Sequence, residues 1–522
     1  MKPVNKLLCL LLAAVLLFST LPQAAAEEED EEAIPVFLCG DSIACTAPGA
    51  AVQGSTLTIT EGGTYALTGT LENGQIRINA SKNDKVKLVL KGASLTCSGA
   101  PAIYCLSAGK TVITTEGGTQ NVLATEGSFA EGDSADAALF SKDDLTLNGS
   151  GTLYIVAEKG HGIVCKDELK ITAGEVTVSA GEKGICGKDG ITIKGGGITV
   201  KAADDAVSSE GDITVSGGTL TVTTGDDGIH ASGNLFVEGG SITVEESYEG
   251  LEGHTVTIRG GIVCINASDD GINAAGGSDA STEGGGFGHD RFMADTDEEA
   301  GITISGGSVT VNAGGDGLDS NGYLLVSGGK TLISGPETGA NGALDYGTFA
   351  CISGGTLIAA GAAGMAEGFG EDSTQASILY AFSKTYAAGT ALSLKDEAGN
   401  TIAAYSPVSS FSSVVISAPA LKSTGTYHLF AGSDEFTIET DGVSWTNRKG
   451  GMPGGPGSRG GFGRFKEFGA PDGEDSLERP DGFGRDSAPW GAPGGVQPPQ
   501  MPEGEPPEMP EGAKPPDWPE RP

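Results

Sequence analysis

Acidic residues recur along the middle of the chain at a nearly constant spacing. Asp226 and Asp227 lie in the stretch GDDGIHASG, and comparable acids occur at equal distances before and after them, at Asp205 and Glu249. A second polar side chain, expected to point outward, follows most of these acids three residues later. Carboxylate and amide oxygens suit Ca²⁺, which takes about six to eight oxygen ligands. The sequence therefore predicts calcium ligands at Asp204, Asp205, Asp226, Asp227, Glu249, Glu252, Asp269, Asp270, Asn273, Asp316, Asp319 and Asp345.

Stacked acids repel one another unless a cation lies among them. Two like charges about 5 Å apart repel by about 1 kcal/mol in water and by about 3–4 kcal/mol at a protein surface. The alternative interpretation is that these acids are turn residues, because Asp-Gly is a common turn pair that needs no metal. The sequence contains neither an EF-hand loop nor the nonapeptide calcium repeat. The calcium prediction therefore rests on stacking and charge.

Three further residues are candidates for contact with a ligand. His230 follows the acid pair, while Arg259 and Arg291 are basic residues near the acidic positions. Arg291 lies in the long insertion at 276–300, and a loop of that length in a regular repeat favours a function. Calcium with a basic residue is what β-elimination next to a uronate requires. A hydrolase would need one distinct pair of acids, which a recurring doublet does not supply, so no catalytic residue is assigned.

The acids occupy a fixed place in a strand-rich repeat. The units KDGITIKGGGITVKAADDA and EGDITVSGGTLTVTTGDDG, at 188–206 and 210–228, align with each other without a gap. Each holds two short strands with alternating apolar residues, separated by a Gly-Gly turn, and a third strand opens the next unit, as at Ile229 and Leu251. Such units cannot bury their apolar faces alone and must stack. We therefore predict an all-β fold, a right-handed parallel β-helix of about 22 residues per coil.

Composition divides the chain into four parts. Residues 1–26 have a positive end, an apolar run and a small-residue cleavage site, which predicts a signal peptide and a secreted or cell-surface protein. Residues 27–371 are assigned to the parallel β-helix with its N-terminal capping coils, and 372–447 to a small C-terminal β cap. Residues 448–522 hold most of the 24 prolines and are expected to form a disordered Gly/Pro-rich tail.

The net charge of −38 at pH 7 favours cations as partners and argues against nucleic acid, which is bound by Lys and Arg. We expect no membrane span and a monomer. A second column of residues is predicted to form an exposed lattice of mutually compensating charges: Lys142 with Asp143, Lys166 with Asp167, and Lys188 with Asp189.

The cysteines do not predict a metal or redox centre. Cys39 and Cys45 are close enough in sequence for a small disulfide. Cys105, Cys165 and Cys264 are expected to face inward, where a thiol acts as a small apolar group. No CxxC pair is present, so the sequence gives no support to a zinc or redox site.

Several sequence blocks taken together resemble a known family. GQIRINA, KVKLVLKGASL, ALFSKDDLTLNGSGTL, GDDGIHAS and GDGLDSNG are similar to blocks of the secreted bacterial carbohydrate-binding domain-containing proteins, which are cellulose- and acidic-sugar-binding β-helix proteins. The resemblance covers roughly 35–445. It implies a polysaccharide-lyase-like right-handed β-helix with bound calcium. It also implies binding of plant cell-wall polymers such as polygalacturonate, without demonstrated cleavage.

We therefore expect calcium-dependent, non-catalytic binding of a polygalacturonate-like acidic polysaccharide, or of cellulose. Calcium among the acids reverses the local charge and can bridge protein and sugar carboxylates. One alternative is a pectate-lyase-like polysaccharide lyase on the same scaffold. The other is a structural surface spike or adhesin in which calcium only stiffens the repeat.

Overall fold

The computed structural model describes residues 33–130, 132, 134–274, 297–339 and 341–448. The predicted signal peptide, Arg291 and all of the predicted tail except Arg448 lie outside the described residues. Within the described part, the chain consists of strands and contains no helix. The predicted all-β class is therefore confirmed.

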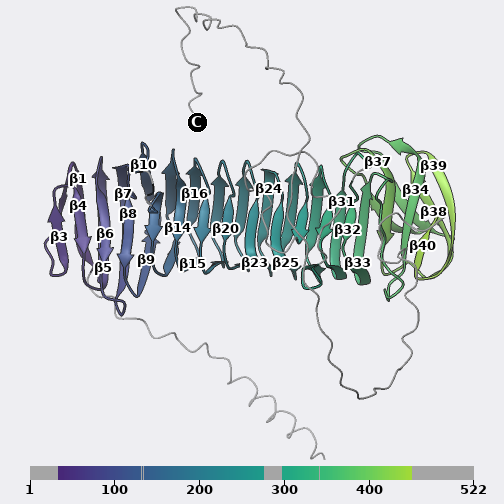
Figure 1. The fold of residues 1–522 in the computed structure, drawn as a ribbon, viewed down its shortest axis with the longest axis horizontal. Helices are drawn as coiled ribbons and strands as arrows, with labels where there is room; N and C mark the ends of the chain where they lie inside the picture. Colours follow the sequence, from purple (N-terminus) through teal and green to yellow (C-terminus); the bar gives the residue numbers. More distant parts are fainter. Residues whose placement is uncertain (1–32, 131, 133, 275–296, 340, 449–522) are drawn as a thin grey trace, which may run out of the picture. The chain divides into compact units, whose positions relative to one another are not determined.

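Three strands of each coil form three faces that continue from coil to coil (Figure 1). We call the first the short-strand face. It consists of β4 (Thr56–Ile59), β6 (Gln75–Asn79), β8 (Ile103–Ser107), β11 (Ala137–Ser141), β14 (His161–Cys165), β17 (Ile185–Gly187), β20 (Val207–Ser209), the first residues of β23 (Ile229–Val237) and β25 (Leu251–Ile258), β27 (Ile272–Ala274), β30 (Leu318–Ser320) and β32 (Leu344–Tyr346).

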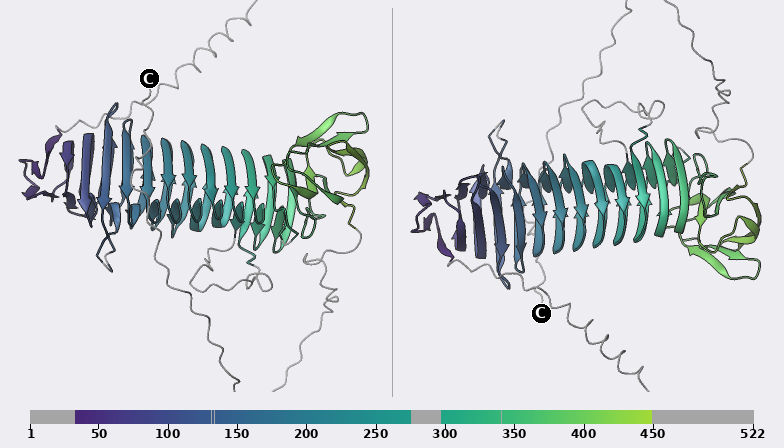
Figure 2. Two further views of the ribbon diagram at one scale, coloured as in Figure 1. Left: turned by 90° about the horizontal axis from the view of Figure 1, so that it is seen from above. Right: turned by 90° about the horizontal axis from the view of Figure 1, so that it is seen from below.

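The remaining strands of each coil make up the other two faces (Figure 2). The second face contains β9 (Lys110–Thr115), β12 (Leu145–Gly149), β15 (Glu168–Ile171), β18 (Gly190–Ile193), β21 (Asp212–Val215), the last residues of β23 and β25, and β28 (Gly301–Ile304). The third contains β10 (Gln120–Glu126), β13 (Thr152–Ala157), β16 (Glu175–Ala180), β19 (Gly197–Lys201), β22 (Thr219–Thr223), β24 (Ser241–Ser247), β26 (Ile262–Ala267) and β29 (Ser308–Ala313), and β1 (Ile34–Gly40) spans both of these faces. Strands β5 (Gly63–Leu71), β7 (Lys85–Ser98), β31 (Tyr323–Ser334) and β33 (Phe349–Gly361) bend across both of these faces.

Strands of the short-strand face are parallel and in register. Ile163 pairs with Ile185, Ile185 with Val207, and Val207 with Ile229, so the residue number advances by the same step from coil to coil. All four side chains are fully buried and stack into one apolar column of the core. The predicted parallel β-helix and its predicted coil length are therefore confirmed.

The Gly-Gly turns form a stacked corner between the second and third faces. Gly218 has a φ of +82°, and a Cβ built on it would lie 2.6 Å from the carbonyl oxygen of Gly196 in the preceding coil. Both the left-handed backbone and this close approach require glycine. The glycine pair thus allows consecutive coils to stack at the spacing of neighbouring strands, about 4.8 Å.

Antiparallel strands occur at both ends of the parallel stack. At the N-terminal end, β2 (Ser42–Ala44) pairs with β1, and β3 (Ala50–Gln53) pairs with β4. At the other end, β33 pairs in antiparallel fashion with β37 (Phe411–Ser417), which also pairs with β34 (Ser377–Tyr386) beside β40 (Ser444–Thr446). A separate antiparallel sheet contains β35 (Leu392–Asp396), β36 (Thr401–Tyr405), β38 (Thr424–Ala431) and β39 (Asp434–Asp441).

The cysteine predictions have mixed outcomes. Cys105 and Cys165 are buried at equivalent positions of the core, as expected. The prediction for Cys264 is wrong: Val263 and Ile265 face the core, and Cys264 between them lies in an outward column with Thr243 and Thr310. The possible disulfide is also absent, since the structure leaves the thiols of Cys39 and Cys45 free.

Candidate metal centre in a stacked acidic corner

The predicted acids stack at one corner of the solenoid, where each coil enters the short-strand face. Backbone hydrogen bonds connect this position from coil to coil: the N–H of Gly228 donates to the Glu249 carbonyl over 2.9 Å, and that of Gly271 to the Asp316 carbonyl over 2.8 Å. We call this set the corner column. It consists of Lys183, Asp205, Asp227, Glu249, Asp270 and Asp316.

A second column lies three residues further along each coil, on the outer side of the short-strand face. Register pairing places Ser208, His230, Glu252, Asn273, Asp319 and Asp345 in this outer column. These side chains point away from the core, as predicted, but several are shielded from solvent. His230 is 5%, Glu252 4% and Asn273 7% exposed. Charged and polar groups this deeply buried need partners.

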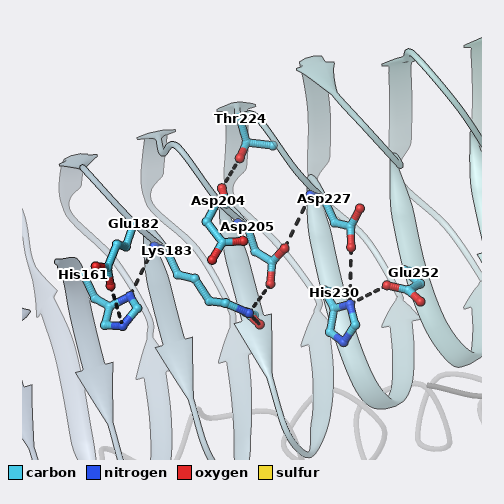
Figure 3. Close-up of polar contacts among 10 residues, drawn as sticks. His161, Glu182, Lys183, Asp204, Asp205, Thr224, Asp227, His230 and Glu252 are labelled. Carbon is cyan, nitrogen blue, oxygen red and sulfur yellow. Dashed lines mark hydrogen bonds and ion pairs between the residues drawn. The ribbon is translucent and has the colours of Figure 1, made fainter. Parts of the chain in front are cut away.

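The corner and outer residues of one coil together form one rung of the stack. In the first rungs, basic side chains of the two columns supply the partners. The Lys183 ammonium lies 2.7 Å from Oδ2 of Asp205 (Figure 3). His230 Nδ1 contacts Oδ2 of Asp227 at 3.4 Å and also the carboxylate of Glu252. Burial lowers the pKa of His230, but its hydrogen bonds to Asp227 and Glu252 outweigh burial and raise the pKa to about 11. The imidazole is therefore a cation at neutral pH, and these rungs carry their own positive charges.

The later rungs have no such cation among the residues that the structure describes. Asp270, Asp316 and Asp319 each present an oxygen, and these oxygens lie within 4.8 Å of one another. Burial and the neighbouring carboxylates raise the pKa of Asp316 to about 8 and that of Asp319 well above its ordinary value. Burial also raises the pKa of Asp270, to about 6. We call these three residues the acidic triad.

A buried oxygen without a partner lies next to the acidic triad. Asn273 pairs in register with Asp319, and its amide nitrogen donates to Oε2 of Glu249 over 2.8 Å. This bond orients the amide, but Oδ1 of Asn273 is buried and has no hydrogen-bond partner among the described residues. An unsatisfied buried oxygen costs about 1–3 kcal/mol. A bound cation would satisfy it and would neutralise the triad.

Acids extend beyond the triad in both directions along the solenoid. Asp345 follows Asp319 in the outer column, and Glu367 interacts electrostatically with it. Burial and Asp345 raise the pKa of Glu367 to about 7, although Arg448 opposes this. On the other side, burial and Glu252 raise the pKa of Glu249 to about 9.

The first doublets form a smaller group. Asp204, Asp205 and Asp226 each offer an oxygen within 4.8 Å of the others, and burial and Asp227 raise the pKa of Asp226 to about 7. Lys183 already binds Asp205 in this group. In the later doublet, Asp269 hydrogen-bonds to Tyr248, a bond that raises the pKa of the tyrosine.

The corner carboxylates also have a structural role, as the turn interpretation predicted. Asp205 Oδ1 accepts the backbone N–H of Asp227 over 3.4 Å, and Asp227 Oδ1 accepts that of Glu249 over 3.3 Å. Asp270 Oδ1 accepts the N–H of Asp316 over 2.6 Å. One oxygen of each acid thus bonds to the next coil. The second oxygens of Asp205 and Asp227 bind Lys183 and His230, and Asp270 offers an oxygen to the acidic triad, so the two interpretations are compatible.

The two predicted arginines do not join the acidic triad in the described structure. Arg259 lies on the second face, where its guanidinium lies 2.9 Å from Glu238 and 5.3 Å from the centre of the Phe236 ring. Arg291 lies outside the described residues. Sequence reasoning missed Lys183 and Glu367. The position of Lys183, one repeat before Asp205, would have placed it in the corner column.

The donor set of the triad fits a hard divalent cation. Carboxylate oxygens of Asp270, Asp316 and Asp319, with the amide oxygen of Asn273, are the ligand types that Ca²⁺ prefers, while His and Cys, which softer metals favour, are absent from this set. Asp345 is the next oxygen donor along the outer column. These residues, rather than the first rungs, form the candidate metal centre.

Comparisons with known proteins agree with the family resemblance. Residues 53–290 match the family model described as carbohydrate-binding domain-containing protein. A protein of that description from Acetivibrio thermocellus is 36% identical over 137 residues, which are 25% of this chain and 48% of the relative. The chain thus spans about half the length of that curated relative. The predicted similarity to the carbohydrate-binding domain-containing family is confirmed.

A solved structure is also similar to part of the chain. It is that of a polysaccharide lyase-like protein from C. thermocellum in its gadolinium derivative, with 29% identity and a TM-score of 0.37. The match covers 41% of this chain and 94% of that one. Among the described residues, no helix has the length and apolar character needed to cross a membrane.

Proposed function

We propose that this protein is a secreted, monomeric and non-catalytic protein that binds a polygalacturonate-like acidic polysaccharide through calcium. The observation that carries the proposal is the acidic triad beside Oδ1 of Asn273, which has no hydrogen-bond partner among the described residues. The match of residues 53–290 to a carbohydrate-binding family supports a sugar as the partner. The apolar, cleavable-looking N-terminus supports secretion.

The charge of the site explains why a metal is needed for an acidic ligand. Three acids without an internal cation offer no positive charge to a uronate, whose own carboxylate is negative. Asp270, Asp316, Asp319 and Asn273 would hold the ion, and Asp345 is the next available donor. Bound Ca²⁺ supplies positive charge and open coordination positions for carboxylate oxygens of a sugar. A neutral polymer such as cellulose gains nothing from this charge.

Among the described residues, which do not include Arg291, the lyase alternative finds no base at the triad. β-Elimination needs a group that removes the proton next to the uronate carboxylate. Arg259 is bound to Glu238 on another face, and Lys183 is bound to Asp205 four coils before Asp316. Within the described residues, no basic side chain forms an ion pair with the triad. Binding without cleavage is therefore the function that this geometry supports best.

The experiment is a titration of metal-stripped protein with polygalacturonate in the presence and absence of calcium. We expect binding only with calcium and no rise in the absorbance of unsaturated product. The double variant Asp316→Asn/Asp319→Asn should lose that binding, whereas Asp189→Asn, an exposed acid of an earlier coil, should keep it. Binding of cellulose in place of polygalacturonate, or no binding with calcium bound, would refute the proposal. Absence of polysaccharide binding with calcium bound would favour the alternative of a structural surface spike or adhesin.

A further inference from the structure

A groove of about 310 Å³ runs along the short-strand face before the acidic rungs begin. Its lining includes Val164, Cys186 and Ser208 from the middles of β14, β17 and β20. These three residues precede His230 in the outer column, so the groove leads directly toward the acidic rungs. The volume lies at the lower end of the range of ligand pockets, about 300–1,000 Å³, which suits a short ligand segment.

Lysines lie on both sides of this groove. Lys166 and Lys188 follow the ends of β14 and β17, and Lys183 precedes the start of β17 on the opposite side. Lys183 is already bound to Asp205 and to Ser208 Oγ. Lys166 and Lys188 are exposed, and neither forms an ion pair in the part of the chain that the structure describes. The acids Asp136 and Glu210 also line the groove, and Lys166 and Lys188 are its lining ammonium groups without an ion pair among the described residues, which leaves them to attract an anion.

The contacts also show that the charges next to these lysines do not cancel in pairs. Burial and then Asp144 raise the pKa of Asp167, which follows Lys166 directly in sequence. A lysine bound to that carboxylate would lower its pKa. In the same column, Asp143 is bound by Lys82 from an earlier coil. The prediction of a mutually compensating lattice is therefore wrong for Lys166 and Lys188.

His161, at the start of β14, lines the groove and has partners at both ring nitrogens. Its Nδ1 accepts the backbone N–H of Lys183 over 3.2 Å, so the ring proton of the neutral form is on Nε2. Nε2 faces Glu182 at 3.2 Å and Asp136 at 3.9 Å. Asp136, His161 and Glu182 thus bring their ligand atoms within 4.8 Å of one another beside the groove.

We infer that this groove binds the carboxylate of an acidic sugar directly, without metal, through Lys166 and Lys188. The half-buried Cys186, packed against the buried Val164, would face the C–H groups of the sugar ring, while the ammonium groups bind its carboxylate. The inference rests on the proposed function for its ligand class. According to this inference, one polymer is bound at two sites: through direct lysine contacts in the earlier coils and through calcium in the later coils.

The test uses digalacturonate as the probe, in buffer with EDTA, by isothermal titration calorimetry on the full chain. We expect measurable binding that weakens with salt, and about tenfold weaker binding for Lys166→Gln/Lys188→Gln, a loss of about 1.4 kcal/mol. The matched control is Lys194→Gln/Lys201→Gln, which changes two exposed lysines of the same coils outside the groove lining. Cellobiose, which has no carboxylate, should bind equally to the groove variant and to the control variant.

The outcomes separate this inference from the proposed function. Absence of digalacturonate binding in EDTA, or equal weakening by the groove and control variants, would overturn the groove assignment. Calcium-dependent polygalacturonate binding that the groove variant retains in full would overturn it as well and leave the proposed function intact. Conversely, lysine-dependent digalacturonate binding, together with polygalacturonate binding that calcium does not change, would support the groove assignment and refute the proposed calcium-dependent function. Circular dichroism melting of each variant checks that the fold is unchanged.

Discussion

The ammonium of Lys183 lies 2.7 Å from Oδ2 of Asp205, and the two residues occupy the same corner position in consecutive coils. A basic residue of one rung thus neutralises the acid of the next. His230 has the equivalent role for Asp227 and Glu252. Past these rungs the corner and outer columns continue with acids and amides, and Asp270, Asp316 and Asp319 meet without a basic partner among the described residues. The internal cations among the described residues therefore end where the acidic triad begins.

Removing the cation of the Lys183–Asp205 pair should destabilise the solenoid. The Asp205 side chain is 3% exposed, so Lys183→Met leaves a buried carboxylate without its charge partner. Loss of one partner of a buried pair costs about 3–5 kcal/mol. We expect the low end of this range, because Asp205 also accepts a backbone N–H. Urea denaturation measures the change, and the Lys183→Met/Asp205→Asn double variant should recover part of the loss. Additive effects of the two changes would contradict direct coupling.

Calcium should stabilise the protein through the acidic triad. A ligand at about 100 times its dissociation constant adds about 2.7 kcal/mol to the free energy of unfolding. We expect calcium to raise the melting temperature of the wild type and to have no effect on Asp316→Asn/Asp319→Asn. Differential scanning calorimetry with calcium or EDTA provides the measurement, and Asp189→Asn is the control. An unchanged calcium shift in the double variant would place the ion elsewhere.

The repeat made the fold and the position of the acids predictable, whereas the pairing of charges was not. The constant spacing of the repeat places Ile163, Ile185 and Val207 in one column, because register in a parallel stack follows directly from the period. The same spacing aligns Asp205 with Asp227. It does not show that Lys183 reaches across to the next coil, since the reach of a flexible side chain depends on local packing.

The remaining errors have similar physical causes. The alternation of apolar residues in IVCINA was assigned to the wrong face at Cys264, because a thiol is compatible with both the core and the surface. Glu367 was not predicted as a site residue because it follows β33, beyond the regular repeat. The course of the loop after β33 brings it near Asp345, with which it interacts electrostatically. Contacts made outside the periodic part of a solenoid cannot be read from its period.

The stability of the metal-free protein should fall as the pH rises from about 5 to about 8. The pKa of Asp270 is raised to about 6 and that of Asp316 to about 8, both above the ordinary value of 3.8. Between the ordinary and raised values the folded state binds more protons than the unfolded state, so deprotonation favours unfolding. His230, whose pKa is raised to about 11, acts in the same direction above its ordinary value of 6.5.

Melting curves from pH 4.5 to 8.5 in EDTA would measure this pH dependence. Calcium should reduce it, because the ion stabilises the ionised carboxylates that otherwise repel one another. The Asp316→Asn variant should show a flatter pH profile than the wild type in EDTA, since it lacks the acid with the higher of the two raised pKa values. A metal-free protein that becomes more stable toward pH 8 would contradict the assignment of these acids to one unneutralised cluster.

Replacing the internal cation at His230 should create an additional calcium site. His230 occupies the outer-column position that Asn273 and Asp319 occupy in later coils, and it is enclosed by Asp227 and Glu252. His230→Asn removes the positive charge and presents an amide oxygen to those two carboxylates, which reproduces the arrangement at the acidic triad. Calorimetric titration should show one more bound calcium per chain than in the wild type. His428→Asn, at a histidine that pairs with the single carboxylate of Glu435, should leave the number unchanged. An unchanged stoichiometry in a folded His230→Asn protein would show that charge neutralisation by His230 is not what keeps calcium out of the earlier rungs.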